Sequence, residues 1–191
     1  MEKQSEIMKL IILDRDGVIN RDSDQFIKSP EEWQPIDGSL DAIAFLTQAG
    51  YTIAVATNQS GIARGYFTVE TLNEMHGKMH RLVQQAGGEI SGVWFCPHMA
   101  DSHCSCRKPE PGMILDILAR FNAEASETYL VGDSLRDLQA ITRAGGRPVL
   151  VLTGKGKKTL AKEKDRLPEN TLVFDDLLAF SQYLREQDKP A

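Results

Sequence analysis

The chain has 191 residues and a formal net charge of −5, with charged residues making up 26% of its composition. This length is typical of one domain with its own hydrophobic core. The acidic balance argues against a general role in binding nucleic acid or another polyanion, and no apolar run approaches the ~20 residues that cross a bilayer.

The first residues, MEKQSEIMKLIIL, contain neither a long apolar segment nor a small-residue cleavage site. We therefore expect no signal peptide and a cytoplasmic protein. In that reducing compartment, clustered cysteines are more often metal ligands or catalytic groups than disulfides.

Short apolar runs alternate with helical patterns along the chain. The runs predict buried strands at 9–13, 51–57, 92–96, 128–132 and 148–152, with 171–174 as a sixth strand at a sheet edge. The patterns between them predict helices at 38–49, 68–86, 111–121, 134–144 and 175–186, and a glycine follows several of these helices.

This alternation predicts an α/β fold in which a Rossmann-like parallel sheet has helices on both faces. We expect a single domain over 1–191, without a cap domain, because the connections between strands are short. The basic run 153–164 is interpreted as a solvated loop and helix start, although Lys155 stands at a strand end where it can reach an anion.

Polar residues follow the predicted strands at the points where the strands end. Asp14 to Gly17 follows the first strand, Thr57 to Gly61 the second, and Gly132 to Asp137 the fourth. In open α/β sheets, ligands bind beyond the carboxyl ends of the strands, so these residues are expected to share one edge.

The carboxylates among them suggest a metal-assisted reaction. Asp14 and Asp16 are two residues apart, and Asp133 adds a third carboxylate. Hard oxygen ligands with open positions suit Mg²⁺, which would keep Asp14 ionised and nucleophilic while Asp16 carries a proton. A turn with a capping aspartate is the alternative for D-x-D-G alone, but Thr57 and Lys108 at other strand ends favour a site.

All three cysteines lie in one loop, together with two histidines. Cys96, His98, Cys104 and Cys106 form a C-x-H, C-x-C pattern of three thiolates and one imidazole, which is typical of a structural zinc site. A loop of free thiols without metal is the alternative. His103 is a further candidate that the symmetrical pattern does not need.

Two other histidines, His76 and His80, lie four residues apart on the predicted helix 68–86. Because no third ligand is apparent, we interpret them as partly exposed helix residues rather than as a metal site.

Four segments in order, LDRDGVI, ATNQSG, RKPEPGM and VGDSLRD, resemble the motifs of the haloacid dehalogenase-like (HAD) superfamily of phosphotransferases. The resemblance implies a double displacement through an aspartyl-phosphate. It makes Asp14 the nucleophile and Asp16 the acid/base, with Thr57 and Lys108 stabilising the phosphoryl group. It also implies that Asp133, the Asp14 carboxylate and the backbone carbonyl of Asp16 ligate Mg²⁺.

Roles in the site are also expected for three further parts of the motifs. Asp137 matches a second acidic position that is frequent in the family, and we interpret it as a residue that orients Lys108 rather than as a metal ligand. The backbone amides of Asn58 to Ser60 are expected to donate to phosphoryl oxygens. Gly17 is expected to allow close backbone approach to the phosphoryl group.

The zinc loop at 96–106 and the run TNQSGIARG resemble the histidinol-phosphate phosphatase-like subgroup, and within it the heptose-bisphosphate branch. This implies a phosphatase that removes the 7-phosphate of a heptose 1,7-bisphosphate for ADP-heptose and lipopolysaccharide core synthesis. A phosphatase acting on histidinol phosphate is the alternative, and a catalytically silent, zinc-stabilised binding module is another.

Loops are expected to select the small sugar bisphosphate, with no nucleic acid or membrane partner, in a protein that is a monomer. Arg107, beside Lys108, is expected to grip the second phosphate, a task for which Arg64 is a further candidate. The expected substrate-binding residues are Asp22, Ser23, Asp24, Gln25, Asn58, Gln59, Ser60, Arg64, Arg107 and Ser134.

Overall fold

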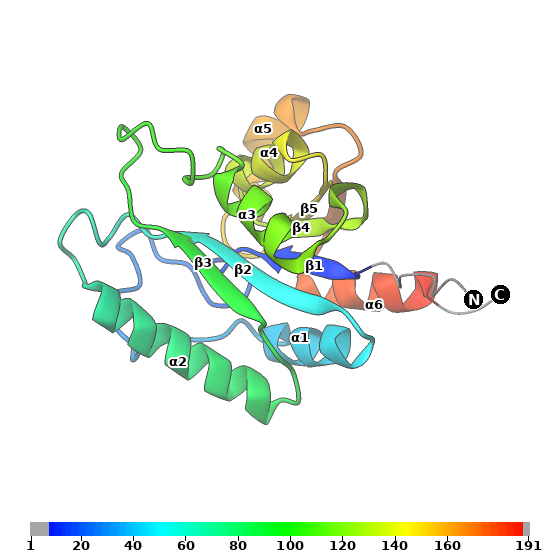
Figure 1. The fold of residues 1–191 in the computed structure, drawn as a ribbon, viewed down its shortest axis with the longest axis horizontal. Helices are drawn as coiled ribbons and strands as arrows, with labels where there is room; N and C mark the ends of the chain where they lie inside the picture. The colour runs from blue at the N-terminus through cyan, green and yellow to red at the C-terminus, as the bar shows by residue number, and fades with distance from the viewer. Residues whose placement is uncertain (1–7, 189–191) are drawn as a thin grey trace.

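The computed structural model describes residues 8–188, which form one six-stranded parallel sheet flanked by helices (Figure 1). The strands are β1 (Leu10–Leu13), β2 (Thr52–Asn58), β3 (Gly92–Cys96), β4 (Tyr129–Gly132), β5 (Arg147–Val151) and β6 (Leu172–Phe174). Their order across the sheet is β3-β2-β1-β4-β5-β6. The order therefore reverses between β1 and β4, where open sheets of this kind place their ligands.

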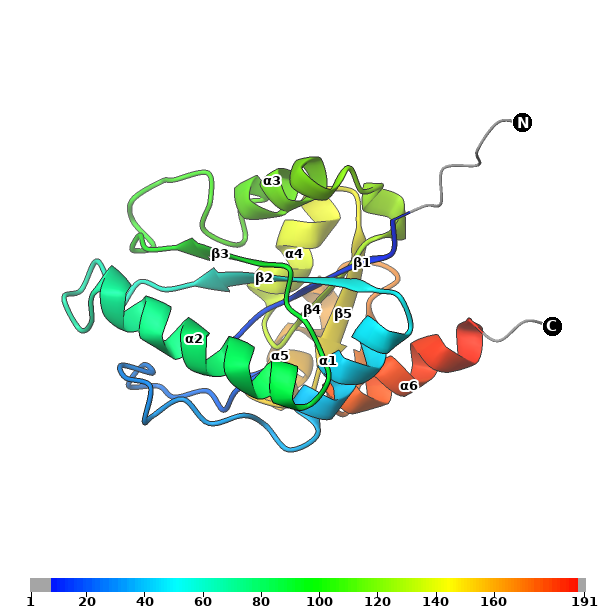
Figure 2. The same ribbon diagram turned by 60° about the horizontal axis from the view of Figure 1, so that its bottom comes forward.

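Helices cover both faces of the sheet (Figure 2). On one face lie α1 (Ser39–Gln48), α2 (Val69–Gln85) and α6 (Leu177–Gln187), and on the other lie α3 (Gly112–Phe121) and α4 (Leu135–Arg143). A further helix, α5 (Gly156–Glu163), follows β5. The two short 3₁₀ turns span Ala125–Glu127 and Lys164–Arg166.

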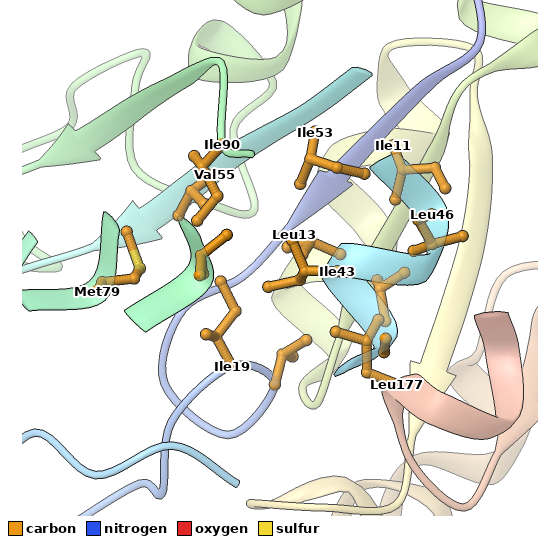
Figure 3. Packing of buried hydrophobic residues seen from close by; sticks show 14 of the residues in the cluster. Ile11, Leu13, Ile19, Ile43, Leu46, Ile53, Val55, Met79, Ile90 and Leu177 are labelled. Carbon is orange, nitrogen blue, oxygen red and sulfur yellow. The ribbon is translucent and has the colours of Figure 1, made fainter. Parts of the chain in front are cut away.

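The core consists of two apolar layers separated by the sheet. Every residue of β1 is fully buried, and alternate residues serve opposite layers: Ile11 and Leu13 pack toward α1, whereas Leu10 and Ile12 pack toward α3. Figure 3 shows the first layer, in which Ile43 of α1 and Met79 of α2 converge on the sheet. A strand buried on both faces must be apolar throughout, which explains the LIIL run.

The predicted fold class is confirmed, and no cap domain interrupts residues 8–188. All six predicted strands are present within one residue of their predicted bounds, with β6 at the edge. The run 153–164 contains a complete helix, α5, rather than only a helix start. The expectation about a signal peptide was made on residues 1–13, of which 1–7 lie outside the described part of the chain. None of the helices between Met8 and Asp188 is long and apolar enough to span a membrane.

Candidate active site

Asp14 and Asp133 stand at the carboxyl ends of β1 and β4, the two strands between which the order reverses. The backbone N–H of Asp14 donates to the carbonyl of Val131 at 2.9 Å, which ties the end of β1 to β4. The sheet thus brings together two carboxylates that are 119 positions apart in the sequence.

Lys108 enters this edge of the sheet as a buried ammonium group, with a side chain 2% exposed. Its Nζ lies 3.0 Å from Asp14 Oδ1, 2.6 Å from Asp137 Oδ1 and 2.7 Å from the Ala56 carbonyl oxygen. These three acceptors use all three of its N–H groups. The Asn58 side chain accepts from the Lys108 N–H at 3.1 Å and donates to its carbonyl at 3.0 Å, which fixes the backbone that carries the lysine.

The carboxylates outnumber the cation beside them. Burial, together with the Asp137 carboxylate, raises the pKa of Asp14 from 3.8 to about 7. Burial and the neighbouring Asp137 and Asp14 carboxylates raise the pKa of Asp133 to about 8. For Asp137, burial alone would raise the pKa, but Lys108 and Ser134 outweigh it and lower the pKa. Two carboxyl groups are therefore left without a sufficient positive partner.

This donor set fits a magnesium ion. Oxygens of Asp14, Asp133 and Asp137 lie within 4.8 Å of one another. Both oxygens of Asp137 are already bound, one to Lys108 and the other to the N–H and hydroxyl of Ser134. Asp14 and Asp133 remain as the carboxylates with capacity for a hard divalent cation, whose charge would restore their ionised forms.

Gly17 leaves space for a neighbouring carboxylate, and the close approach to a phosphoryl group expected of it stays a prediction. Its φ is +85°, and a Cβ at this position would collide with the Asp133 carboxylate. The absence of a side chain thus makes room for Asp133, which accepts a hydrogen bond from the Lys155 N–H at 2.7 Å on the same side.

Asp16 is held as an anion by three neighbours. The Nη2 of Arg15 lies 2.9 Å and 3.1 Å from the two Asp16 oxygens, and Asn20 and Gln59 each donate to one of them at 2.9 Å. Burial alone would raise the pKa of Asp16, but the Arg15 guanidinium and these hydrogen bonds outweigh it and lower the pKa.

A cavity of about 270 Å³ opens above these groups. It brings together most of the predicted site residues, namely Asp14, Asp16, Asp22, Ser23, Asp24, Asn58, Ser60, Arg64, Arg107, Lys108, Asp133 and Ser134. The predicted residue Gln25 lies instead in a neighbouring hollow with Phe26, Lys28 and Tyr66.

Two predicted residues at the end of β2, Thr57 in the strand and Gln59 just after it, are buried and do not line the cavity. Thr57 is fully buried, and its hydroxyl oxygen accepts a hydrogen bond from Gln59 Nε2 at 2.8 Å. Gln59 uses the same amide group for Asp16, and its backbone N–H donates to the Cys96 carbonyl at 2.7 Å. Both Gln59 amides thus have acceptors within the protein in this structure, and substrate binding by Gln59 stays a prediction.

Three cavity residues were not among the predicted ones: Phe26, Arg136 and Lys155. Lys155 Nζ lies 3.0 Å from Asp22 Oδ2, so this lysine belongs to the site and not to a wholly solvated loop. Phe26 has a φ of +67°, an unusual conformation for a bulky residue, and the Arg64 guanidinium lies 5.7 Å from its ring centroid. Arg136 lies in the segment VGDSLRD, but nothing in the spacing of that segment distinguishes it from a surface arginine.

The cysteine loop brings its four predicted ligands together beside the cavity. The Cys106 Sγ lies 3.1 Å from that of Cys96 and 3.6 Å from that of Cys104, and His98 Nδ1 lies 3.3 Å from Cys106 Sγ. Tetrahedral zinc with bonds of about 2.3 Å to sulfur separates its thiolates by about 3.8 Å, so the set fits a zinc ion. Arg107 Nη1 donates to the His98 carbonyl at 3.1 Å, which joins the arginine to this cluster.

Known proteins resemble the chain along almost its whole length. A family model described as HAD-hydrolase-like matches residues 105–180. D-glycero-beta-D-manno-heptose-1,7-bisphosphate 7-phosphatase of Neisseria meningitidis serogroup A is 71% identical over 181 residues, which is 95% of this chain and 97% of the relative. The protein of the same name from Escherichia coli K12 is 35% identical over 95% of this chain and 96% of its own. The crystal structure of D,D-heptose 1,7-bisphosphate phosphatase from Bordetella bronchiseptica, complexed with magnesium and phosphate, matches with a TM-score of 0.91 and 55% identity, covering 94% and 99% of the two chains.

Proposed function

The chain belongs to the D-glycero-β-D-manno-heptose-1,7-bisphosphate 7-phosphatase family of HAD-like hydrolases, and we propose that it hydrolyses the 7-phosphate of this sugar through an aspartyl-phosphate on Asp14. The observation that carries the proposal is the cavity itself. It is lined by Asp14, by the Lys108 that holds it, and by Asp16.

In the first half of the reaction, an Asp14 oxygen forms a bond to phosphorus as the bond to the sugar oxygen breaks. Asp16 gives its proton to the departing oxygen, and a phosphate dianion beside it favours the protonated acid that this step requires. In the second half, Asp16 takes a proton from water, whose oxygen displaces Asp14 and releases inorganic phosphate. Lys108 opposes negative charge on the transferring group, and the free O–H of Thr57 donates to it.

Magnesium is proposed as the cofactor, held by the carboxylates of Asp14 and Asp133 and, by family resemblance, by the backbone carbonyl of Asp16. When bound, it would supply a positive charge that neutralises the phosphoryl oxygens.

The second phosphate is proposed to bind at the arginine end of the cavity. Burial and the nearby Arg136 and Arg64 guanidinium groups lower the pKa of Arg107, which reflects a concentration of positive charge. A second phosphate would relieve this repulsion and accept paired hydrogen bonds from Arg107. Histidinol phosphate, which carries a cationic amine at its other end, gains nothing from these arginines.

We further propose that zinc occupies the cysteine cluster as a structural ion, and that the enzyme is a cytoplasmic monomer that supplies ADP-heptose for lipopolysaccharide core synthesis. The reducing conditions of the cytoplasm would keep Cys96, Cys104 and Cys106 as free thiols that can bind a metal. The intact set of Asp14, Asp16, Lys108 and Asp133 argues against a catalytically silent binding module.

The test compares kcat/KM for the β and α anomers of heptose 1,7-bisphosphate and for histidinol phosphate, in the natural protein and in Arg107→Ala. We expect the β anomer to be preferred. We expect Arg107→Ala to lower kcat/KM for the bisphosphate by about tenfold to a hundredfold, because it removes charge-assisted hydrogen bonds, and to leave histidinol phosphate almost unaffected. A preference for histidinol phosphate would overturn the proposed substrate.

A further inference from the structure

Arg15 is a fully buried arginine in the middle of the D-R-D-G turn. Its Nε lies 3.2 Å and its Nη2 lies 2.9 Å from Asp16 Oδ1, and Nη2 also lies 3.1 Å from Asp16 Oδ2. This geometry leaves Nη1 directed away from the carboxylate. A fully buried guanidinium needs hydrogen-bond acceptors for its N–H groups, including those on Nη1.

His76 supplies that partner from a distant part of the chain. It lies on α2, is only 7% exposed, and places its Nε2 3.4 Å from Arg15 Nη1. Because arginine can only donate, His76 must accept with Nε2, which requires a neutral ring with its proton on Nδ1. Burial, followed by the Arg15 charge, lowers the pKa of His76 to about 3, in agreement with a neutral ring.

The interpretation of His76 as a partly exposed helix residue is therefore wrong. His80, one helical turn further on, is the remaining titratable group that affects the proton affinity of His76, beside Arg15 and Asp16. His80 is more exposed, and neither histidine lines the catalytic cavity.

We propose that His76 is a positioning residue for the acid/base Asp16: it fixes the Arg15 guanidinium, and the guanidinium fixes the carboxylate. This inference rests on the proposed function, because it takes Asp16 as the group that moves the proton. A proton donor acts efficiently only when it is held within hydrogen-bond reach of the reacting oxygen, and a small displacement of the carboxylate lowers the rate.

Neither Arg15 nor His76 lines the cavity, so neither is available to bind the sugar bisphosphate. Loss of the His76 contact should therefore slow turnover and leave substrate binding intact. A residue that merely stabilised the fold would not separate kcat from KM in this way.

The kinetic test compares His76→Leu, His76→Gln and His80→Leu in the full chain with Mg²⁺. His76→Leu removes the acceptor at similar volume, and we expect kcat to fall at least about tenfold with KM changed less than about twofold. In His76→Gln the amide oxygen replaces Nε2, so kcat should return to within about threefold of the natural protein. His80→Leu, the matched control, should be unchanged. Equal kcat in His76→Leu and the natural protein, or no recovery in His76→Gln, would overturn the proposal.

A second measurement needs no activity and covers the case in which His76→Leu fails to fold. Long-range ¹H–¹⁵N NMR of the imidazole groups in the natural protein, with His76 assigned by its absence in His76→Gln, reports which ring nitrogen carries the proton. We expect Nδ1 to be protonated and Nε2 to be free at neutral pH. A proton on Nε2 would contradict the contact with Arg15 even if the protein hydrolyses the bisphosphate. A free Nε2 in a protein that does not turn over the sugar would instead reject the proposed function alone.

Discussion

Lys108 is the residue around which the charges of the site balance. It is shared between Asp14 and Asp137, which lie 3.0 Å and 2.6 Å from its ammonium group. The pKa of Asp137 is lowered and that of Asp14 is raised, so the lysine mainly compensates Asp137. Asp14 is left as the less stabilised carboxylate, which suits the role of nucleophile proposed for it.

This asymmetry predicts different effects on the melting temperature for two similar substitutions, both of which lower kcat. Asp14→Asn should abolish phosphate release, by at least about a thousandfold in kcat, because the amide cannot form the covalent intermediate. It should not lower the melting temperature at pH 8, because it removes a carboxyl whose ionisation burial opposes. Asp137→Asn should lower both kcat and the melting temperature, since breaking a buried ion pair costs about 3–5 kcal/mol. Calorimetry and a phosphate-release assay on both variants check this. Equal destabilisation by the two would contradict the charge assignment.

Among single residues of the site, those that directly follow strands could be predicted from the sequence, whereas contacts between buried polar side chains could not. Asp14, Lys108 and Asp133 could be predicted because the carboxyl ends of parallel strands share an edge. The Arg15–His76 contact joins positions 61 apart, and no periodicity marks it. Gln59 was identified, but its use in holding Asp16 depends on a rotamer that only the packed structure defines.

The element that connects the two proposed metals is the loop between β3 and α3, the long green loop of Figure 1. The four residues of the cysteine cluster lie between Cys96 and Cys106, and Arg107 and Lys108 follow directly after them. Arg107 donates a hydrogen bond to the carbonyl of His98, so a proposed zinc ion that ordered the cysteine cluster would also help to hold the arginine.

Loss of a zinc ligand should therefore reduce both metal content and substrate recognition. His98→Gln is expected to lower tightly bound zinc from one equivalent to below about half and to raise KM for the bisphosphate, since Arg107 loses its support. His103→Gln, in the same loop, should retain zinc and KM. Metal analysis by mass spectrometry and steady-state kinetics make the comparison. Zinc loss in His103→Gln alone would show that the wrong histidine was assigned.

The elements themselves were predictable where apolar residues follow a clear period. β1 is apolar throughout because both its faces are covered, and it was found within one residue. The helix α5 was predicted only as a helix start, because it buries just Gly156 and Thr159 and so carries no apolar stripe.

The fold of the whole molecule buries several carboxyl groups at one edge of the sheet, and their ionisation lowers the free energy of unfolding. Asp14 and Asp133 have pKa values of about 7 and about 8 in the folded protein, raised mainly by burial. Between pH 4 and their folded pKa values, the folded state holds these protons and the unfolded chain does not. The free energy of unfolding therefore falls as the pH rises through this range.

Without added Mg²⁺, the free energy of unfolding should decrease between about pH 5 and about pH 8.5, and added Mg²⁺ should reduce the decrease by binding the folded state. Urea unfolding at several pH values, with and without the ion, measures both effects. Asp133→Asn is the control and should show a smaller pH dependence. A natural protein whose stability rises over this range would contradict the assignment of the two raised pKa values.

The central claim, that the protein removes the 7-phosphate of a heptose 1,7-bisphosphate, is tested most directly by ³¹P NMR of the reaction. The account predicts that the 7-phosphate signal of the β anomer disappears as inorganic phosphate grows, while the anomeric 1-phosphate signal persists. Loss of the 1-phosphate signal, or no change in either signal with Mg²⁺ present, would contradict it.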